Sequence, residues 1–122
     1  MMNPLKHVDT HMEGLISDLQ MLIRQPSVSA KNEGIEECAK LVQKLLKKSG
    51  VKSEILRLKK GVAPIVYGEV KSKQNPNKTL LFYNHYDVQP AEPFDLWDSP
   101  HLVEQERETK SLDVGQLMTK VN

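Results

Sequence analysis

Cysteine and aromatic residues are scarce in this sequence. It contains one cysteine, Cys38, and aromatic residues make up 5% of its 122 positions. A single cysteine excludes an internal disulfide and is typical of a protein kept in a reducing compartment, so we expect a cytoplasmic location. The aromatic content is low for a complete domain, because Phe, Tyr and Trp supply much of the apolar area of most cores.

The sequence also lacks a long apolar run and a dominant charge. None of its apolar stretches approaches the roughly 20 residues that a membrane-spanning helix requires, and residues 1–7 do not follow the pattern of a secretory signal. Lys and Arg together number 17, against 16 for Asp and Glu, which gives a net charge of +1. Such a balance gives no electrostatic reason to bind nucleic acid or an anionic membrane. These absences favour a soluble, intracellular chain of one domain's length.

Residues 7–25 have the periodicity of an amphipathic helix, with apolar side chains every three or four positions and Pro26 as the residue that cannot continue it. His7 and His11 stand four apart in this stretch, a spacing compatible with a metal site on a helix. Because zinc takes at least three protein ligands and no third one is suggested nearby, two histidines on a polar first turn is the preferred interpretation.

A second helix is predicted over residues 33–49. Ser29 or Asn32 is its expected N-cap, and Gly50 is its expected C-terminal stop. Cys38 falls on the apolar stripe, so we interpret it as a core residue and not as a nucleophile. The expected buried face consists of Ile35, Cys38, Ala39, Leu41, Val42, Leu45 and Leu46.

Three strand-like segments follow, over residues 51–58, 63–70 and 79–86. A polar, lysine-containing stretch at 71–78 separates the second from the third and is typical of a solvated hairpin loop. The third segment is the most apolar, and we expect it deepest in the sheet. Two helices followed by three strands predict a layered α/β domain whose later elements are not included, with an irregular tail.

The third segment ends in the sequence Asn84-His85-Tyr86-Asp87-Val88-Gln89-Pro90. Sites in open α/β sheets are usually built at the carboxyl ends of strands. His85 and Asp87 are two residues apart, so an extended chain projects both side chains from one face. This arrangement suits an imidazole bound to a metal ion with a carboxylate that holds the ring, although a histidine at a strand end is also commonly a hydrogen-bonded structural residue.

Up to Pro100 the chain resembles the zinc metallopeptidases that include carnosine-type dipeptidases, glutamate carboxypeptidase, acetylornithine deacetylase and succinyl-diaminopimelate desuccinylase. The specific match is the segment 84–90 followed by Leu96-Trp97-Asp98-Ser99-Pro100. Supporting matches are the segment 22–29, which resembles the one that closes the family's first helix, and the second helix with its glycine and strand. The residues at 86–90 and the loop that contains Trp97 are most similar to the dipeptidase-like branch.

The resemblance implies a function and a site. His85 would be a ligand to one of two divalent metal ions, with zinc expected and manganese or cobalt as alternatives, and Asp87 would be the carboxylate that orients its ring. The family's paired metals activate a water that attacks an amide carbonyl. Its bridging carboxylate, glutamate base and second histidine come from later in such chains; Glu104, Glu106 and Glu108 are not at matching positions. The substrate would be a small peptide or an N-acyl amino acid, and dimerisation would require a lid domain that these residues do not include.

Residues 101–122 depart from the family, which continues with a Gly-Arg-Gly-x-x-Asp-Asp-Lys-Gly motif. Reading codons 112–122 from each third base can encode Gly-Arg-Gly-Ala-Thr-Asp-Asp-Lys-Gly-Glu. Met118-Thr119 forces one of these residues, because ATG-ACN contains GAC, an Asp codon. We therefore expect residues 1–100 to be the N-terminal part of a metallopeptidase catalytic domain and 101–122 to be a frame-shifted tail without selected packing.

Two classes of function follow from the sequence. The first is a metal-dependent hydrolase of peptide or acyl-amide bonds, of dipeptidase, carboxypeptidase or deacylase type. The second is a non-catalytic truncated product or a small α/β interaction module. One imidazole cannot hold a catalytic zinc, because such sites use about three protein ligands. We therefore expect the 122-residue chain to be inactive and to bind metal weakly at one site at most.

Overall fold

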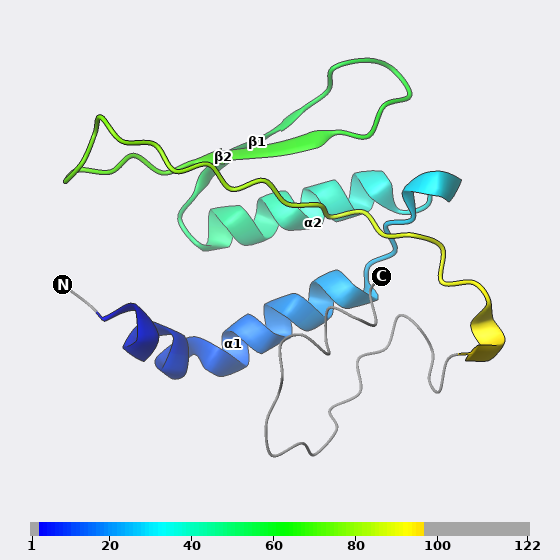
Figure 1. Cartoon of the computed structure of the whole chain (residues 1–122), viewed down its shortest axis with the longest axis horizontal. Helices are drawn as coiled ribbons and strands as arrows, with labels where there is room; N and C mark the ends of the chain where they lie inside the picture. Colours follow the sequence, from blue (N-terminus) through cyan, green and yellow to red (C-terminus); the bar gives the residue numbers. More distant parts are fainter. Residues whose placement is uncertain (1–2, 97–122) are drawn as a thin grey trace.

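The structure, a computed structural model, describes residues 3–96. Two α-helices come first and a two-stranded antiparallel sheet follows, which confirms the expected α/β class with helices before strands. Figure 1 shows the arrangement: helix α2 lies between helix α1 and the strand pair β1–β2. In this part of the chain, no helix is both long and apolar enough to cross a membrane.

Helix α1 spans Pro4–Arg24. The side chain of Asn3 caps it by accepting the Leu5 N–H at 3.0 Å, and Pro4 occupies the first helical turn, where its missing N–H costs nothing. This Asn-Pro start places the beginning of the helix three residues earlier than the apolar periodicity alone predicts. The helix ends at Arg24 because Pro26 biases Gln25 toward the extended conformation that it adopts.

Helix α2 spans Ile35–Lys48, within the predicted range. The expected cap at Ser29 or Asn32 is wrong: Ser29 begins the short 3-10 helix Ser29–Lys31, and Asn32 has a left-handed backbone. The N-cap is Gly34, which also has a positive φ, so no side-chain oxygen caps this helix. Its first turn instead contains Glu36 and Glu37, which complement the helix dipole.

The C-terminus of α2 confirms the predicted glycine stop. Gly50 has φ 78° and donates its N–H to the Lys47 carbonyl at 3.0 Å, while the Val51 N–H reaches the Leu46 carbonyl at 2.9 Å. These two bonds form a Schellman motif, which satisfies carbonyl groups that the helix leaves unpaired. The chain then reverses directly into the first strand.

Strands β1 (Lys52–Leu56) and β2 (Ile65–Glu69) pair antiparallel, with Ile55 opposite Val66. Both lie inside the predicted segments. Alternate residues of β1 are half-buried against α2, which contacts both strands. The Gln43 side-chain amide also donates to the Ser53 carbonyl at 3.1 Å, so one face of the strand pair is covered by α2.

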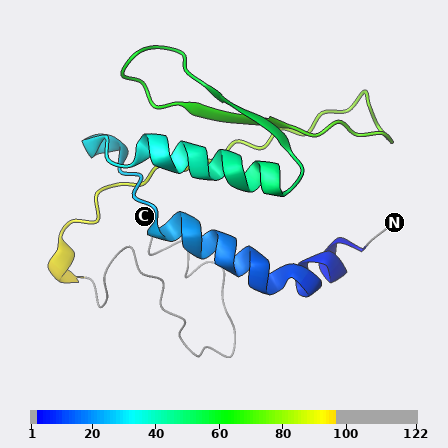
Figure 2. The same ribbon diagram turned by 180° about the vertical axis from the view of Figure 1, so that it is seen from behind.

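The core of the described residues is small and centred on α2. Its buried apolar side chains are Ile35, Cys38 and Ala39, and Cys38 is 2% exposed, which confirms its predicted place in the core. The other predicted core positions of α2 are half-buried. Helix α1 lies on the opposite side of α2 from the strands, joined through an ion pair between Lys48 and Asp18 at 2.7 Å (Figures 1 and 2).

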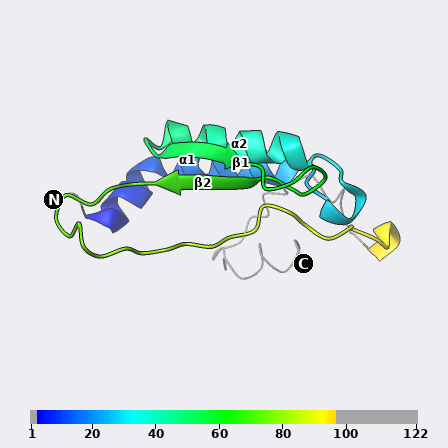
Figure 3. The same ribbon diagram turned by 90° about the horizontal axis from the view of Figure 1, so that it is seen from above.

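The predicted third strand is wrong as a paired element. Residues 79–86 form no ladder with β2, and the segment runs along the β2 side of the strand pair (Figure 3). Leu80, Leu81, Phe82 and Tyr83 are 76–83% exposed, so this segment is the least buried part of the predicted sheet and not the deepest. An apolar strand of this kind needs layers on both faces, and residues 3–96 do not provide them. The predicted irregular tail, 101–122, lies outside the described residues.

Candidate metal centre

His85 and Asp87 are brought together as the sequence predicts. The His85 Nδ1 lies 3.0 Å from Asp87 Oδ1, and the two side chains are 70% and 36% exposed. When Nδ1 donates its proton to the carboxylate, the lone pair of the imidazole lies on Nε2. A ring held in this way is oriented as a metal-ligating histidine is by its outer carboxylate.

Asp87 is held in its ionised form by its neighbours. Hydrogen bonds from the Ser29 side chain and from His85 lower the pKa of the Asp87 carboxyl below its ordinary value, because both stabilise the charged form. Ser29 belongs to the connector between α1 and α2, so this contact links two segments that are distant in the sequence. The sequence suggested Ser29 as a helix cap and as part of the family-like segment 22–29, and no sequence signal predicted its contact with Asp87.

The connector also fixes the backbone beyond the site. The Val88 N–H donates to the Ser27 carbonyl at 3.0 Å, and Val28 and Val88 form a parallel bridge. Val28 in turn exchanges two backbone hydrogen bonds with Glu33, just before α2. The segment after Asp87 is therefore anchored, although the apolar segment before His85 is not paired.

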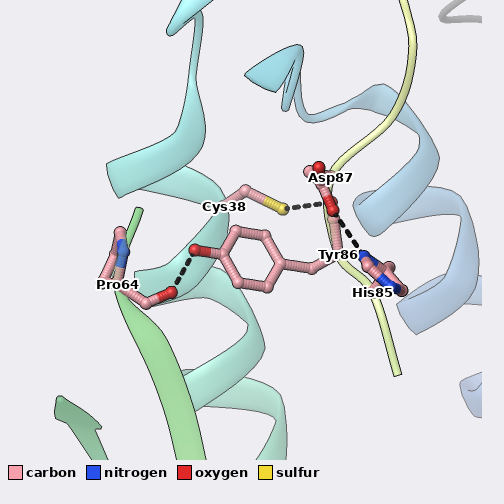
Figure 4. Close-up of polar contacts among 5 residues, drawn as sticks. All are labelled: Cys38, Pro64, His85, Tyr86 and Asp87. Atoms are coloured by element: carbon pink, nitrogen blue, oxygen red, sulfur yellow. Dashed lines mark hydrogen bonds and ion pairs between the residues drawn. The ribbon is translucent and has the colours of Figure 1, made fainter. Parts of the chain in front are cut away.

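Tyr86 lies between His85 and Asp87 and points away from both, toward β2. Its hydroxyl donates to the buried Pro64 carbonyl at 2.5 Å, and its own carbonyl accepts from Cys38 Sγ at 3.7 Å (Figure 4). Burial raises the pKa of the Tyr86 hydroxyl and also that of the Cys38 thiol. Tyr86 thus connects the site segment to both α2 and the entry to β2, and alternation along the extended chain leaves His85 and Asp87 on the other side.

The rings of Tyr83 and His85 are in contact and nearly perpendicular. The two ring centroids are 5.4 Å apart, with an interplanar angle of 83°. Further along the chain, Glu92 forms an exposed ion pair with Lys31 at 2.5 Å, which joins the loop after the site to the same connector. The hydrogen bond with Glu92 raises the pKa of Lys31.

The residues at this site could supply part of the coordination of a metal ion. His85 offers Nε2 as one ligand, and Asp87 offers the carboxylate that fixes the ring. Within residues 3–96, no group of three or more His, Cys, Asp and Glu side chains could hold a metal ion. Within the described residues, this site therefore offers one candidate ligand, His85, with Asp87 as its hydrogen-bond partner.

No known protein-family model matches the chain, and no curated protein matches it either. The resemblance to metallopeptidases rests on the residues of segment 84–90 and its neighbours. The family assignment stays a prediction.

Proposed function

We propose that residues 1–100 are the N-terminal part of a metal-dependent hydrolase of peptide or acyl-amide bonds. The observation that carries this proposal is the 3.0 Å contact between His85 Nδ1 and Asp87 Oδ1, which leaves Nε2 as the metal-binding nitrogen. This contact lies in the segment 84–90, whose sequence resembles the first metal-ligand motif of the dipeptidase-like metallopeptidases.

In the complete enzyme, His85 would hold one of two divalent ions, and Asp87 would keep its ring in position. When bound, the metal pair, zinc or alternatively manganese or cobalt, would supply an activated water and polarise the amide carbonyl. This chain's own contribution is positional. Asp87 stays ionised because Ser29 and His85 both hydrogen-bond to it, so it accepts the Nδ1 proton throughout the neutral pH range.

The proposed substrate is a small peptide, with an N-acyl or succinylated amino acid as the alternative. All of these place a planar amide between small polar groups, and the residues that would select among them are not in the described part of the chain. We propose a cytoplasmic enzyme that pairs with a second copy only when a lid domain is present.

Restoring the reading frame tests the proposal. The motif codons begin at third bases, so one base inserted after codon 100 brings them into frame. We expect the restored, metal-loaded product to hydrolyse dipeptides or N-acyl amino acids, and a His85→Ala variant of it to lose this activity. The 122-residue chain itself should show no hydrolysis. If the nucleotide sequence does not encode the Gly-Arg-Gly motif in the shifted frame, the frame-shift hypothesis is contradicted.

One observation favours a second candidate, a non-catalytic product or small interaction module. The four consecutive apolar residues 80–83 are all more than three-quarters exposed. An exposed apolar segment of this kind, with unpaired backbone groups, is a template for association with another chain. Hydrolysis by the metal-loaded 122-residue chain would contradict this candidate, and association of the purified chain through residues 80–83 would support it.

A further inference from the structure

A pair of histidines lies on the exposed first turns of α1, away from the segment that contains His85. His7 and His11 are one helical turn apart, and their rings stack with centroids 4.1 Å apart and an interplanar angle of 27°. Both side chains are exposed. Residues four apart on a helix are neighbours on one face. Each nitrogen lone pair lies in the plane of its ring, so the exposed His7 ring has to turn out of the stack for one ion to contact both imidazoles.

The hydrogen bonds of His11 determine which of its nitrogens can bind a cation. Its Nδ1 lies 2.8 Å from the His7 carbonyl oxygen and 3.0 Å from Thr10 Oγ1. The single hydrogen of the Thr10 hydroxyl can go to the Lys6 carbonyl at 2.9 Å or to the His7 carbonyl at 3.0 Å. The His7 carbonyl can only accept a hydrogen bond from His11 Nδ1. Nδ1 is therefore the protonated nitrogen, and Nε2 has the lone pair. A backbone carbonyl that accepts from the outer ring nitrogen is the usual support for a metal-ligating histidine.

We propose that His7 and His11 together chelate one divalent transition-metal ion, with Cu²⁺ bound more tightly than Ni²⁺ or Zn²⁺. Two imidazoles and solvent suit the tetragonal nitrogen and oxygen geometry of Cu²⁺ and Ni²⁺, and divalent affinities rise to a maximum at copper. Zinc is disfavoured because its sites use at least three protein ligands. Asp9 lies two residues from each histidine, on another part of the helix surface, and does not complete a zinc site.

Chelation also has a consequence for α1. The helix has no buried residue, and Leu5 and Val8 near its start are exposed. An ion held between positions i and i+4 binds only when that turn is helical, so it stabilises the helical state by mass action. Bound metal should therefore increase the helical content of the chain.

The test uses the 122-residue chain without a histidine tag, titrated with Cu²⁺ and followed by visible absorption and by circular dichroism at 222 nm. We expect one ion per chain at this site and a gain in helical signal. His7→Gln and His11→Gln should each weaken Cu²⁺ binding by about tenfold or more, equivalent to about 1.4 kcal/mol. His85→Gln should leave this binding step unchanged, which separates it from the proposed hydrolytic site.

A spacing control keeps the number of histidines constant. In the double variant Asp9→His/His11→Gln the two histidines stand two apart and do not face each other, so binding should be as weak as in His11→Gln. Unchanged affinity in either single variant, or full affinity in the double variant, would overturn the proposal. Loss of the step in His85→Gln alone would place the ion at the other site and would overturn it as well.

Discussion

The Cys38 thiol is almost completely buried and donates a hydrogen bond to a backbone carbonyl. Its Sγ lies 3.7 Å from the Tyr86 carbonyl, and burial raises the pKa of the thiol above its ordinary value of 9.0. Only the thiolate is a nucleophile, so both effects oppose reaction. The thiol therefore serves as an apolar packing group that ties α2 to the site segment.

We predict that Cys38 reacts with a disulfide reagent at pH 8 much more slowly in the native chain than in urea. The native reaction is slower because the raised pKa of Cys38 in the folded chain keeps the thiol neutral at pH 8. The reaction rate should increase as the pH rises above 9. Tyr86→Ala, which removes the anchored ring, should accelerate the native reaction. Equal rates in buffer and in urea would show that Cys38 is not protected by the fold.

In the proposed metal site, the orientation of the His85 ring depends on Asp87. Because its pKa is lowered, the ionised form is favoured in the folded chain, and the resulting stabilisation is lost as the pH falls through the folded pKa. We expect Ser29→Ala to raise the pKa of Asp87 and Ser29→Thr, which keeps a hydroxyl, to leave it lowered. Carbon NMR of the Asp87 carboxyl measures both. An unchanged titration in Ser29→Ala would remove Ser29 from the site.

At the scale of elements, two glycines with positive φ bracket α2, and only one is crowded. A Cβ on Gly50 meets no heavy atom within 4 Å, whereas one on Gly34 would lie 2.1 Å from the Pro26 carbonyl oxygen. The connector that contacts Asp87 therefore passes directly against the start of α2. Glycine is required at position 34 because of both its positive φ and the nearby Pro26 carbonyl, whereas at position 50 only the positive φ requires it.

We predict that Gly50→Ala destabilises α2 by about 1 kcal/mol, the cost of a left-handed residue with a side chain. Gly34→Ala should add an overpacking cost of about 1–3 kcal/mol and should also disturb the bridge between Val28 and Val88. Hydrogen–deuterium exchange of α2 peptides measures both as local opening free energies. Gly61→Ala, at another uncrowded glycine outside α2, is the control. Equal effects at positions 34 and 50 would contradict the crowded contact.

The elements that sequence reasoning predicted correctly are those with local causes. Apolar periodicity, Pro26 and Gly50 predict α1 and α2, and the strand-like segments 51–58 and 63–70 contain β1 and β2, because each of these signals depends on neighbours within a few residues. The prediction of a buried strand at 79–86 was wrong. Its apolar residues indicate burial, and burial depends on covering layers that residues 3–96 do not provide. The pairing of His85 with Asp87 was predictable from a two-residue spacing, whereas the support from Ser29 arises from tertiary folding of the connector.

At the scale of the whole molecule, the exposed apolar surface is large relative to the core. The described residues bury Ile35, Cys38 and Ala39, while residues 80–83 and most of the apolar stripe of α1 remain exposed or half-buried. Apolar burial contributes roughly 25 cal/mol per Å², and a chain that leaves this much uncovered gains little of it. A cooperative monomeric fold needs more burial than residues 3–96 show.

We therefore predict that the purified 122-residue chain self-associates or binds a hydrophobic dye, and that it melts without a sharp transition. The double variant Leu81→Lys/Phe82→Lys should reduce both association and dye binding, because it places charges on the exposed apolar segment 80–83. Lys71→Ala/Lys73→Ala, in the polar loop before it, is the matched control and should not. Light scattering after size exclusion and calorimetry measure these properties. A monomer with a sharp melt and no dye binding would instead identify a self-sufficient module, in which case the exposed segment 80–83 would not drive association.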